Sequence, residues 1–357
     1  VPLFAWWRYF QKFYYRGRTL LYALCNKHST GKCVRLSYYL SQSLPMSHFI
    51  LQRTFIMVLT MLVLSFVVFY LGNLEPNLRK LALEQNNNRM SQADVDSWLE
   101  KNGYRRSFIV RYGEWTAGVL SGDFGYSTRF RMPVNEALPK RLGYTGILAF
   151  WVLMTMVPSA LLIGILSGMR EGSALDRFLS LFSVTTTATP EYVSGILFTV
   201  IFASLLGWFK GVANVKDITF ENFTLPVMTM SIYGMGYIAR MTRASMSEVM
   251  TSQYIRTAHL KGLPFKTVVL KHALRNALIA PFTVILLQFP WLLTGVVIVE
   301  KLFNYKGFGW TLVEAAENND VDMLLACSLV SVLVVIGTQL ISDVGYAYLN
   351  PRIRVES

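Results

Sequence analysis

Cysteine is scarce in this sequence, and its spacing excludes a disulfide framework. Only Cys25, Cys33 and Cys327 occur, an odd number without regular spacing. Cys25 and Cys33 flank His28, but no fourth ligand is apparent beside them, so a zinc site is not indicated. The sequence also shows no paired carboxylates, no nucleophile with a matching base and no metal-binding constellation, which argues against a membrane enzyme.

Acidic residues are few as well: 21 Asp and Glu oppose 34 Lys and Arg, giving a formal net charge of +13. This surplus does not form one patch, so binding to nucleic acid is not expected. Residues 1–53 contain no acid and the basic residues Arg8, Lys12, Arg16, Arg18, Lys27, Lys32, Arg35 and Arg53. Basic residues beside a hydrophobic span indicate its cytoplasmic end.

A nucleotide-binding loop is missing too. The segment STGKC, residues 29–33, has Asn26 where a P-loop needs a glycine. Cys33 also replaces the hydroxyl that would bind Mg²⁺. The chain is therefore predicted to carry no ATPase site and no cofactor of its own.

What the sequence does have is apolar length. Hydrophobic residues make up 53% of it and the mean hydropathy is +0.38, which is typical of a membrane protein. Crossing a bilayer takes about 20 apolar residues. The predicted spans are 54–72, 144–168, 178–209, 225–238, 277–299 and 324–348.

These spans predict an all-α membrane protein with six transmembrane helices. Residues 46–73 would form the first helix, 74–143 a large polar external loop, and 144–357 a five-helix core. For the basic, aromatic extension 1–45, two interpretations are open. Either Met46 is the natural start and upstream sequence has been translated, or WWRYFQKFYYR is a helix lying on the membrane surface.

Pro190 is expected to bend the third span, and Glu191 follows it directly. Counted at ~1.5 Å per residue from Arg177, Glu191 lies about 21 Å into a core of about 30 Å. An ionisable group at that depth is costly, which makes it a functional candidate. Two readings are open: Glu191 lines a translocation path, or it bonds nearby threonine hydroxyls and backbone freed by Pro190.

A polar and basic segment, residues 243–276, interrupts the apolar pattern; we call it the polar loop. Residues 247–261 favour a helix, and Gly262 with Pro264 supplies a stop. One face of this helix is predicted to carry Met246, Met250, Tyr254 and Ala258, spaced by four. A second helix is predicted to follow, and one of its sides would carry Leu263, Thr267, Leu270 and Leu274. The basic excess assigns the loop and both termini to the cytoplasm.

The polar loop resembles a known family. YIRTAHLKG and HALRNALIAP are similar to the cytoplasmic loop of the membrane subunits of ATP-binding-cassette importers, in the dipeptide, oligopeptide and nickel branch (the B-type permease of the pair). In other branches Glu-Ala-Ala stands where this chain has Arg256, Thr257 and Ala258. Further matches are the turn 122–125 and the motif Val299, Glu300, Phe303, Gly307 and Gly309. The resemblance covers roughly residues 46–354.

The resemblance implies a type I (MetI-like) importer architecture in the bacterial inner membrane. It implies a coupling helix that docks on an ATPase, with the contact residues Tyr254, Arg256, Thr257, Ala258, Lys261 and Gly262. The partners it implies are a second permease subunit, two ATPases that bind ATP and Mg²⁺, a substrate-binding protein, and membrane lipid. Peptides are the leading expected substrate; nickel complexes, opines and oligosaccharides are not distinguished.

An ion-gradient-driven secondary transporter is the alternative. Such a protein would favour internal repeats and ion-coupling charges within the membrane. Here Glu191 is the one obvious deep charge, and the polar loop is elaborate. The sequence therefore favours the importer.

Overall fold

The computed structural model describes residues 46–85, 90–215 and 217–349. The chain divides into two units, and nearly all described residues belong to the unit Phe55–Leu349. The other unit is described only over Met46–Thr54, the first turns of helix α3 (Met46–Gly72). The predicted extension 1–45 and the closing segment 350–357 lie outside the described residues.

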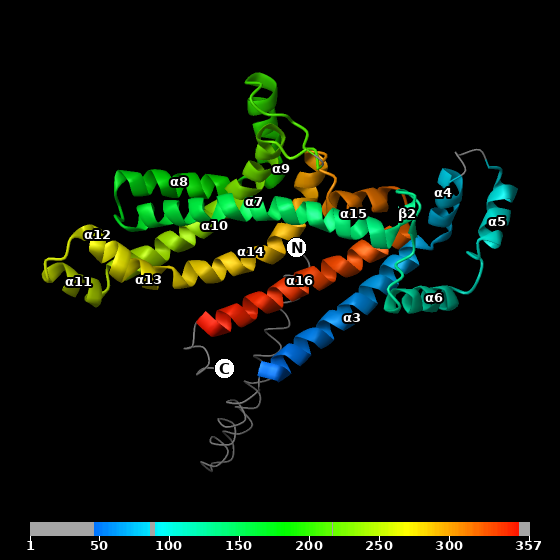
Figure 1. The fold of residues 1–357 in the computed structure, drawn as a ribbon, viewed down its shortest axis with the longest axis horizontal. Helices are drawn as coiled ribbons and strands as arrows, with labels where there is room; N and C mark the ends of the chain where they lie inside the picture. Colours follow the sequence, from blue (N-terminus) through cyan, green and yellow to red (C-terminus); the bar gives the residue numbers. More distant parts are fainter. Residues whose placement is uncertain (1–45, 86–89, 216, 350–357) are drawn as a thin grey trace, which may run out of the picture. The chain divides into compact units, whose positions relative to one another are not determined.

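Most of the described chain is helical, as predicted (Figure 1). After α3 come α4 (Glu75–Gln85), α5 (Gln92–Lys101), α6 (Phe108–Leu120), the antiparallel strands β1 (Tyr126–Ser127) and β2 (Met132–Pro133), α7 (Val134–Gly168), α8 (Ala174–Ala188), α9 (Glu191–Phe198), the π-helix η1 (Thr199–Leu205), α10 (Phe220–Met250), α11 (Gln253–Leu260), α12 (Phe265–Thr267), the π-helix η2 (Val268–Ala273), α13 (Leu274–Ala277), α14 (Ile279–Leu302), α15 (Phe308–Glu317) and α16 (Val321–Leu349).

The segment predicted as a large polar external loop, 74–143, contains the three helices α4, α5 and α6 before its glycine turn. Ser91 starts α5 with a capping box: its hydroxyl accepts from the Asp94 backbone N–H, and the Asp94 carboxylate accepts from the Ser91 N–H. Helices α4 and α5 then share a small apolar core of Leu78, Ala82, Val95 and Leu99. This part of the chain folds locally.

The glycine turn at 122–125 is present as predicted. Gly122 and Gly125 both have positive φ, 86° and 84°, a conformation that other residues rarely adopt. A Cβ at Gly125 would also lie 2.5 Å from a carboxylate oxygen of Asp322. The turn therefore holds the β1–β2 hairpin against the start of α16.

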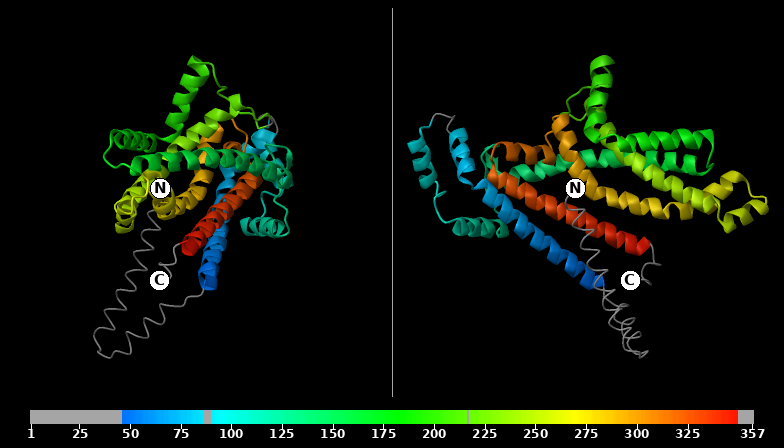
Figure 2. Two further views of the ribbon diagram at one scale, coloured as in Figure 1. Left: turned by 60° about the vertical axis from the view of Figure 1, so that its left-hand side comes forward. Right: turned by 180° about the vertical axis from the view of Figure 1, so that it is seen from behind.

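Helices α7 and α10 pack side by side (Figures 1 and 2). α7 begins at Val134, ahead of the start expected at residue 144. A Cβ at Gly164 would lie 2.6 Å from the Ala239 carbonyl oxygen, and one at Gly168 would lie 2.7 Å from that of Arg243. These two glycines, four residues apart, let the two backbones approach closely, as small residues do between membrane helices.

The third predicted span is broken at Pro190, as expected. α8 and the α9–η1 segment are bent by 103° with respect to each other. Thr189 adopts an extended conformation at the end of α8, which is usual for a residue before proline. Pro190 has no N–H with which to continue the α8 hydrogen-bond ladder.

Three of the described helices are long and apolar enough to cross a membrane, or five if each bent pair is one span. The second bent pair joins residues 265–277 to α14 at 48°. The fourth predicted span, 225–238, lies within α10 and is not among them. The count of six spans therefore stays a prediction.

Candidate functional site

The polar loop starts inside α10, and its first predicted helix is two helices in the structure. α10 runs to Met250 and α11 begins at Gln253, so a single helix over 247–261 was wrong. The hydroxyls of Thr251 and Ser252 donate to the carbonyls of Glu248 and Val249, at 2.9 and 2.6 Å. Such bonds offer the backbone an alternative to the helical ladder, and they occur where α10 ends.

The break at Thr251 changes which residues of α11 are buried. Ile255 is fully buried and Ala258 is 6% exposed, while Tyr254 is 43% exposed. The predicted four-residue stripe therefore does not coincide with the buried side of α11, because Tyr254 is exposed and accepts a hydrogen bond from the Asn276 amide at 2.9 Å. The four-residue spacing failed because α11 does not continue the axis of α10.

Gly262 ends α11 as predicted. Its φ is 74°, and the Gly262 N–H donates to the His259 carbonyl at 2.9 Å. A Cβ there would meet nothing within 4 Å, so the backbone conformation alone requires glycine. Pro264 then starts the next helical segment.

The second predicted helix contains a π-helix, and this alters its buried stripe. The segment 265–277 passes from α12 through η2 to α13. Because a π-helix bonds i to i+5, it does not keep the α-helical register. The buried side chains are Val268, Val269, Ala273 and Ala277, and Leu270 is 65% exposed. The predicted stripe that included Leu270 was wrong.

The polar loop has its own apolar core. It joins the end of α10 to α11 and the π-helix through Met246, Ile255, Ala258, Val268, Val269, Ala273 and Ala277. Met169, at the end of α7, packs against this core. The loop is thus a folded element attached to the helices.

An ion pair between a buried carboxylate and a half-buried arginine ties the loop to the α7–α8 turn. Arg243 donates to both carboxylate oxygens of Asp176, at 2.6 and 2.8 Å. The Asp176 side chain is 3% exposed, and it also accepts from Ser167 and from the Gly172 N–H, at 2.5 and 2.9 Å. Sequence reasoning missed this pair, because 67 residues separate its members.

The remaining predicted contact residues lie on the surface of the loop. Arg256, Thr257, Lys261 and Gly262 are all exposed, and Leu260 is 81% exposed among them. The structure brings these residues together around the end of α11. They form an exposed surface, both basic and apolar, that is supported from beneath by the loop core.

Glu191 is the first residue of α9, directly after the bend. One of its carboxylate oxygens is buried and has no hydrogen-bond partner among the described residues, while the side chain of Trp291 hydrogen-bonds the carboxyl group. Trp291 in turn stacks on Tyr233, with ring centroids 5.2 Å apart.

The threonine hydroxyls near Glu191 do not bond it. Those of Thr185, Thr186, Thr187 and Thr189 donate to backbone carbonyls within α8. The described contacts therefore do not support the reading in which these hydroxyls satisfy Glu191, and Trp291 takes that place.

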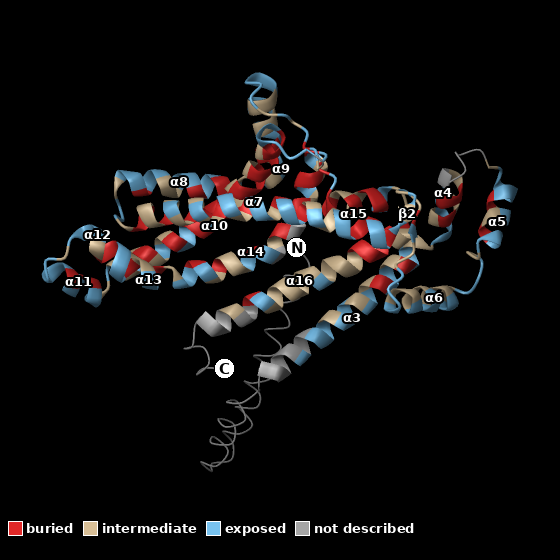
Figure 3. Ribbon diagram, in the orientation of Figure 1, coloured by how far each residue is buried: buried red, intermediate tan, exposed pale blue. Residues whose placement is uncertain are grey.

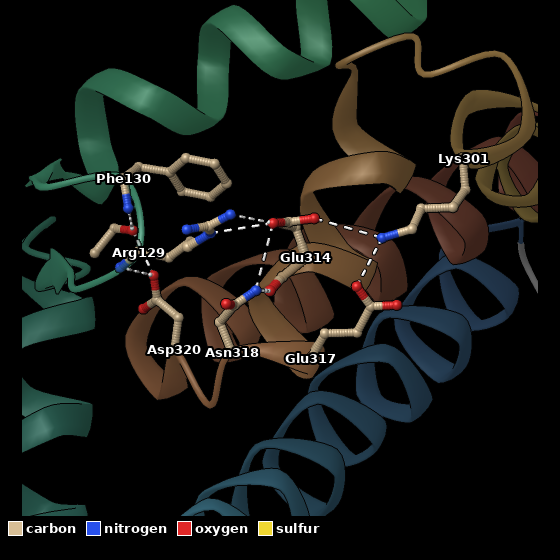
Figure 4. Close-up of polar contacts among 8 residues, drawn as sticks. Arg129, Phe130, Lys301, Glu314, Glu317, Asn318 and Asp320 are labelled. Carbon is tan, nitrogen blue, oxygen red and sulfur yellow. Dashed lines mark hydrogen bonds and ion pairs between the residues drawn. The ribbon is translucent and has the colours of Figure 1, made fainter. Parts of the chain in front are cut away.

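A second polar cluster lies where α14 ends and α15 follows (Figure 4). Arg129 donates to one oxygen of Glu314, at 2.7 and 3.1 Å, and Lys301 bonds both Glu314 and Glu317, at 3.4 and 2.7 Å. Asp320 accepts from the Arg129 N–H at 3.1 Å. Burial alone would raise the pKa of the Glu314 carboxyl, but its bonds to Arg129 and Lys301 outweigh burial and lower that pKa.

Glu300 explains the glycine motif that follows α14. It is fully buried and accepts from the Trp310 N–H at 2.9 Å and from the Thr145 hydroxyl. A Cβ at Gly307 would lie 2.2 Å from the Glu300 carboxylate, and one at Gly309 would lie 2.6 Å from the backbone of Val297. The two glycines thus let the 307–310 backbone close over α14.

Known proteins similar to this chain were found by sequence. The family described as binding-protein-dependent transport system inner membrane component matches residues 160–355. The oligopeptide transport system permease protein AppB of Bacillus subtilis is 31% identical over 319 residues, covering 86% of this chain and 99% of AppB. The glutathione transport system permease protein GsiC of Salmonella typhimurium is 32% identical, covering 87% and 99%. A putative peptide permease of Brucella suis is 29% identical, covering 87% and 100%.

Among solved structures, an amino acid ABC transporter crystallised with histidines is similar at 14% identity and a TM-score of 0.45. The match covers 60% of this chain and 93% of that one.

Proposed function

This chain belongs to the family of binding-protein-dependent transport system inner membrane components, and we propose that it is the permease subunit of an ATP-driven peptide importer. It would form the translocation path with a second permease subunit in the bacterial inner membrane. Two ATPases would bind ATP and Mg²⁺ on the cytoplasmic side, and a binding protein would deliver the substrate. The single observation that carries this proposal is the polar loop, a folded element of family sequence with an exposed end.

The proposed mechanism is alternating access. ATP closes the ATPase pair, and the end of α11 moves with it. The loop core and the Arg243–Asp176 pair connect α11 to α7, α8 and α10, so a displacement of the loop would pass to those helices. Peptide is the proposed substrate class because relatives are named for oligopeptide, glutathione and peptide transport.

Purification and uptake test the proposal together. The full-length chain, expressed with the genes for its candidate partners, is expected to co-purify with two ATPases and a second permease. Peptide uptake into vesicles is expected to stop when ATP is depleted while the ion gradients are kept. Uptake that persists without ATP and collapses with an ionophore would favour the secondary transporter.

We propose further that Glu191 and Pro190 line the translocation path. Glu191→Gln keeps the shape of the side chain and removes its charge. It is expected to lower peptide uptake about tenfold, a change of about 1.4 kcal/mol, because an ionisable group within a membrane span is costly and marks a functional site. Transport assays on purified complexes in vesicles measure this.

Glu221→Gln is the matched control. Glu221 is an exposed carboxylate near the start of α10 that pairs with Lys210. Uptake equal to wild type is expected for this variant. Equal uptake by Glu191→Gln and wild type would show that Glu191 has no role in the path.

A further inference from the structure

The first half of helix α6 packs on the later part of α3 through its aromatic side chains. Phe108 lies edge-on against Phe66 and Phe69, with ring centroids 5.4 and 5.5 Å apart. Tyr112 lies 5.4 Å from the Phe69 ring, and its hydroxyl is 2.9 Å from the hydroxyl of Ser65. The same hydroxyl reaches the Leu62 carbonyl at 3.4 Å. These contacts fix α6 beside residues 62–70 of α3.

Those contacts also fix the depth of α6. The apolar span in α3 is Thr54–Gly72. At ~1.5 Å per residue, residues 62–70 lie about 3 to 15 Å inward from its end at Gly72. A helix that packs on them lies level with the hydrocarbon of one leaflet and does not stand in the water beyond it.

The side of α6 that faces away from α3 is apolar and uncovered. Ile109 is 77% and Leu120 85% exposed, and Gly113 and Ala117 between them are exposed too. Their spacing of three to four residues puts them on one side of the helix. No residue of α6 is buried, as Figure 3 shows.

α6 carries two charged residues, Arg111 and Glu114, that are costly to place in hydrocarbon, and both have polar partners. The Arg111 guanidinium donates to the Tyr104 carbonyl at 3.0 Å and also to Asn73. Glu114 pairs with Arg106 at 2.8 Å. Residues of α3 beside α6 continue the apolar surface, since Leu62 is 49% and Phe66 47% exposed.

We propose that α6 is embedded in the leaflet nearer to Gly72, with lipid acyl chains covering its outer side. The chain would then hold a membrane segment that does not cross the bilayer, and this segment would lie within residues 74–143, which the sequence predicts to be an external loop. Lipid is the occupant that fits, because an apolar surface at this depth that continues the surface of a span contacts the same solvent as the span. The inference needs α3 to cross the membrane and does not depend on the substrate.

Lipid-borne quenchers test the proposal. In a full-length chain with its three native cysteines replaced, Leu120→Cys and Ile109→Cys each receive a polarity-sensitive fluorophore. The chain is assembled with its partners in nanodiscs that carry nitroxide-labelled phospholipid. Both labels are expected to lose most of their emission, and aqueous iodide is expected to have little effect on them.

Glu100→Cys, on the exposed side of α5, is the matched control, and its label is expected to respond to iodide and not to nitroxide lipid. If iodide quenches the Leu120 and Ile109 labels as strongly as the control, the helix lies in water and the proposal is wrong. If neither quencher reaches them, protein covers the face and the proposal is equally wrong. Each variant must retain peptide uptake, and Ala117→Cys replaces any variant that does not.

Discussion

Arg256→Glu is expected to lower ATP-driven peptide uptake at least about tenfold while the protein still inserts and folds. Arg256 is exposed in the middle of α11 and makes no ion pair with any described residue, so little loss of stability is expected from its replacement. If an ATPase binds this surface, reversing one charge costs about 2 kcal/mol or more at the interface. Uptake and ATP hydrolysis stimulated by loaded binding protein are the two measurements.

Arg177→Glu is the matched control for that experiment. Arg177 is an exposed arginine near the start of α8, outside the polar loop, and the net charge changes by the same amount. Near-normal uptake is expected from it. Undiminished stimulation of ATP hydrolysis in Arg256→Glu would remove α11 from the coupling mechanism.

Arg243→Ala is expected to lower the free energy of unfolding by about 3 kcal/mol or more. The substitution leaves the Asp176 carboxylate, whose side chain is 3% exposed, without its cation. Breaking a buried pair on one side costs more than the pair contributes, because an uncompensated charge stays buried. Thermal or denaturant unfolding of the purified protein in detergent measures the loss.

Two further variants isolate this effect. Arg240→Ala removes an exposed arginine one turn earlier on α10 that has no ion pair among the described residues, and a loss of about 0.5 kcal/mol or less is expected. Removing both partners, with Asp176→Leu and Arg243→Met, is expected to cost less than Arg243→Ala alone. Equal losses from Arg240→Ala and Arg243→Ala would show that the pair does not hold the polar loop.

Several helix ends and turns of the chain could be predicted from residues that act locally. Gly262 ends α11 because its backbone conformation is open to glycine alone at little cost. Pro190 breaks the third span because it lacks an N–H, and the glycines of the 122–125 turn adopt positive φ. Each of these effects needs only one residue and its immediate neighbours, so the sequence is enough to locate it.

The faces of the helices in the loop could not be predicted in that way. Four-residue spacing put Tyr254 on one continuous face with Met246, Met250 and Ala258, but the bonds of Thr251 and Ser252 end α10 and α11 starts on a new axis. The π-helix over residues 268–273 shifts the next stripe in the same manner. Spacing predicts a face only while the helix stays continuous.

By itself, the sequence of this protein determined a helical membrane chain, the family it belongs to, and the positions where its helices stop or bend. These follow from composition and from local backbone preferences, although among the helix ends and bends this holds for Pro190 and Gly262 and not for the break between α10 and α11. The tertiary structure decided the rest: which loop residues are buried, that Asp176 holds Arg243, that Trp291 meets Glu191, and that α6 lies against α3. Those contacts join residues 47 to 100 positions apart, and no local preference records which distant side chain will arrive beside another.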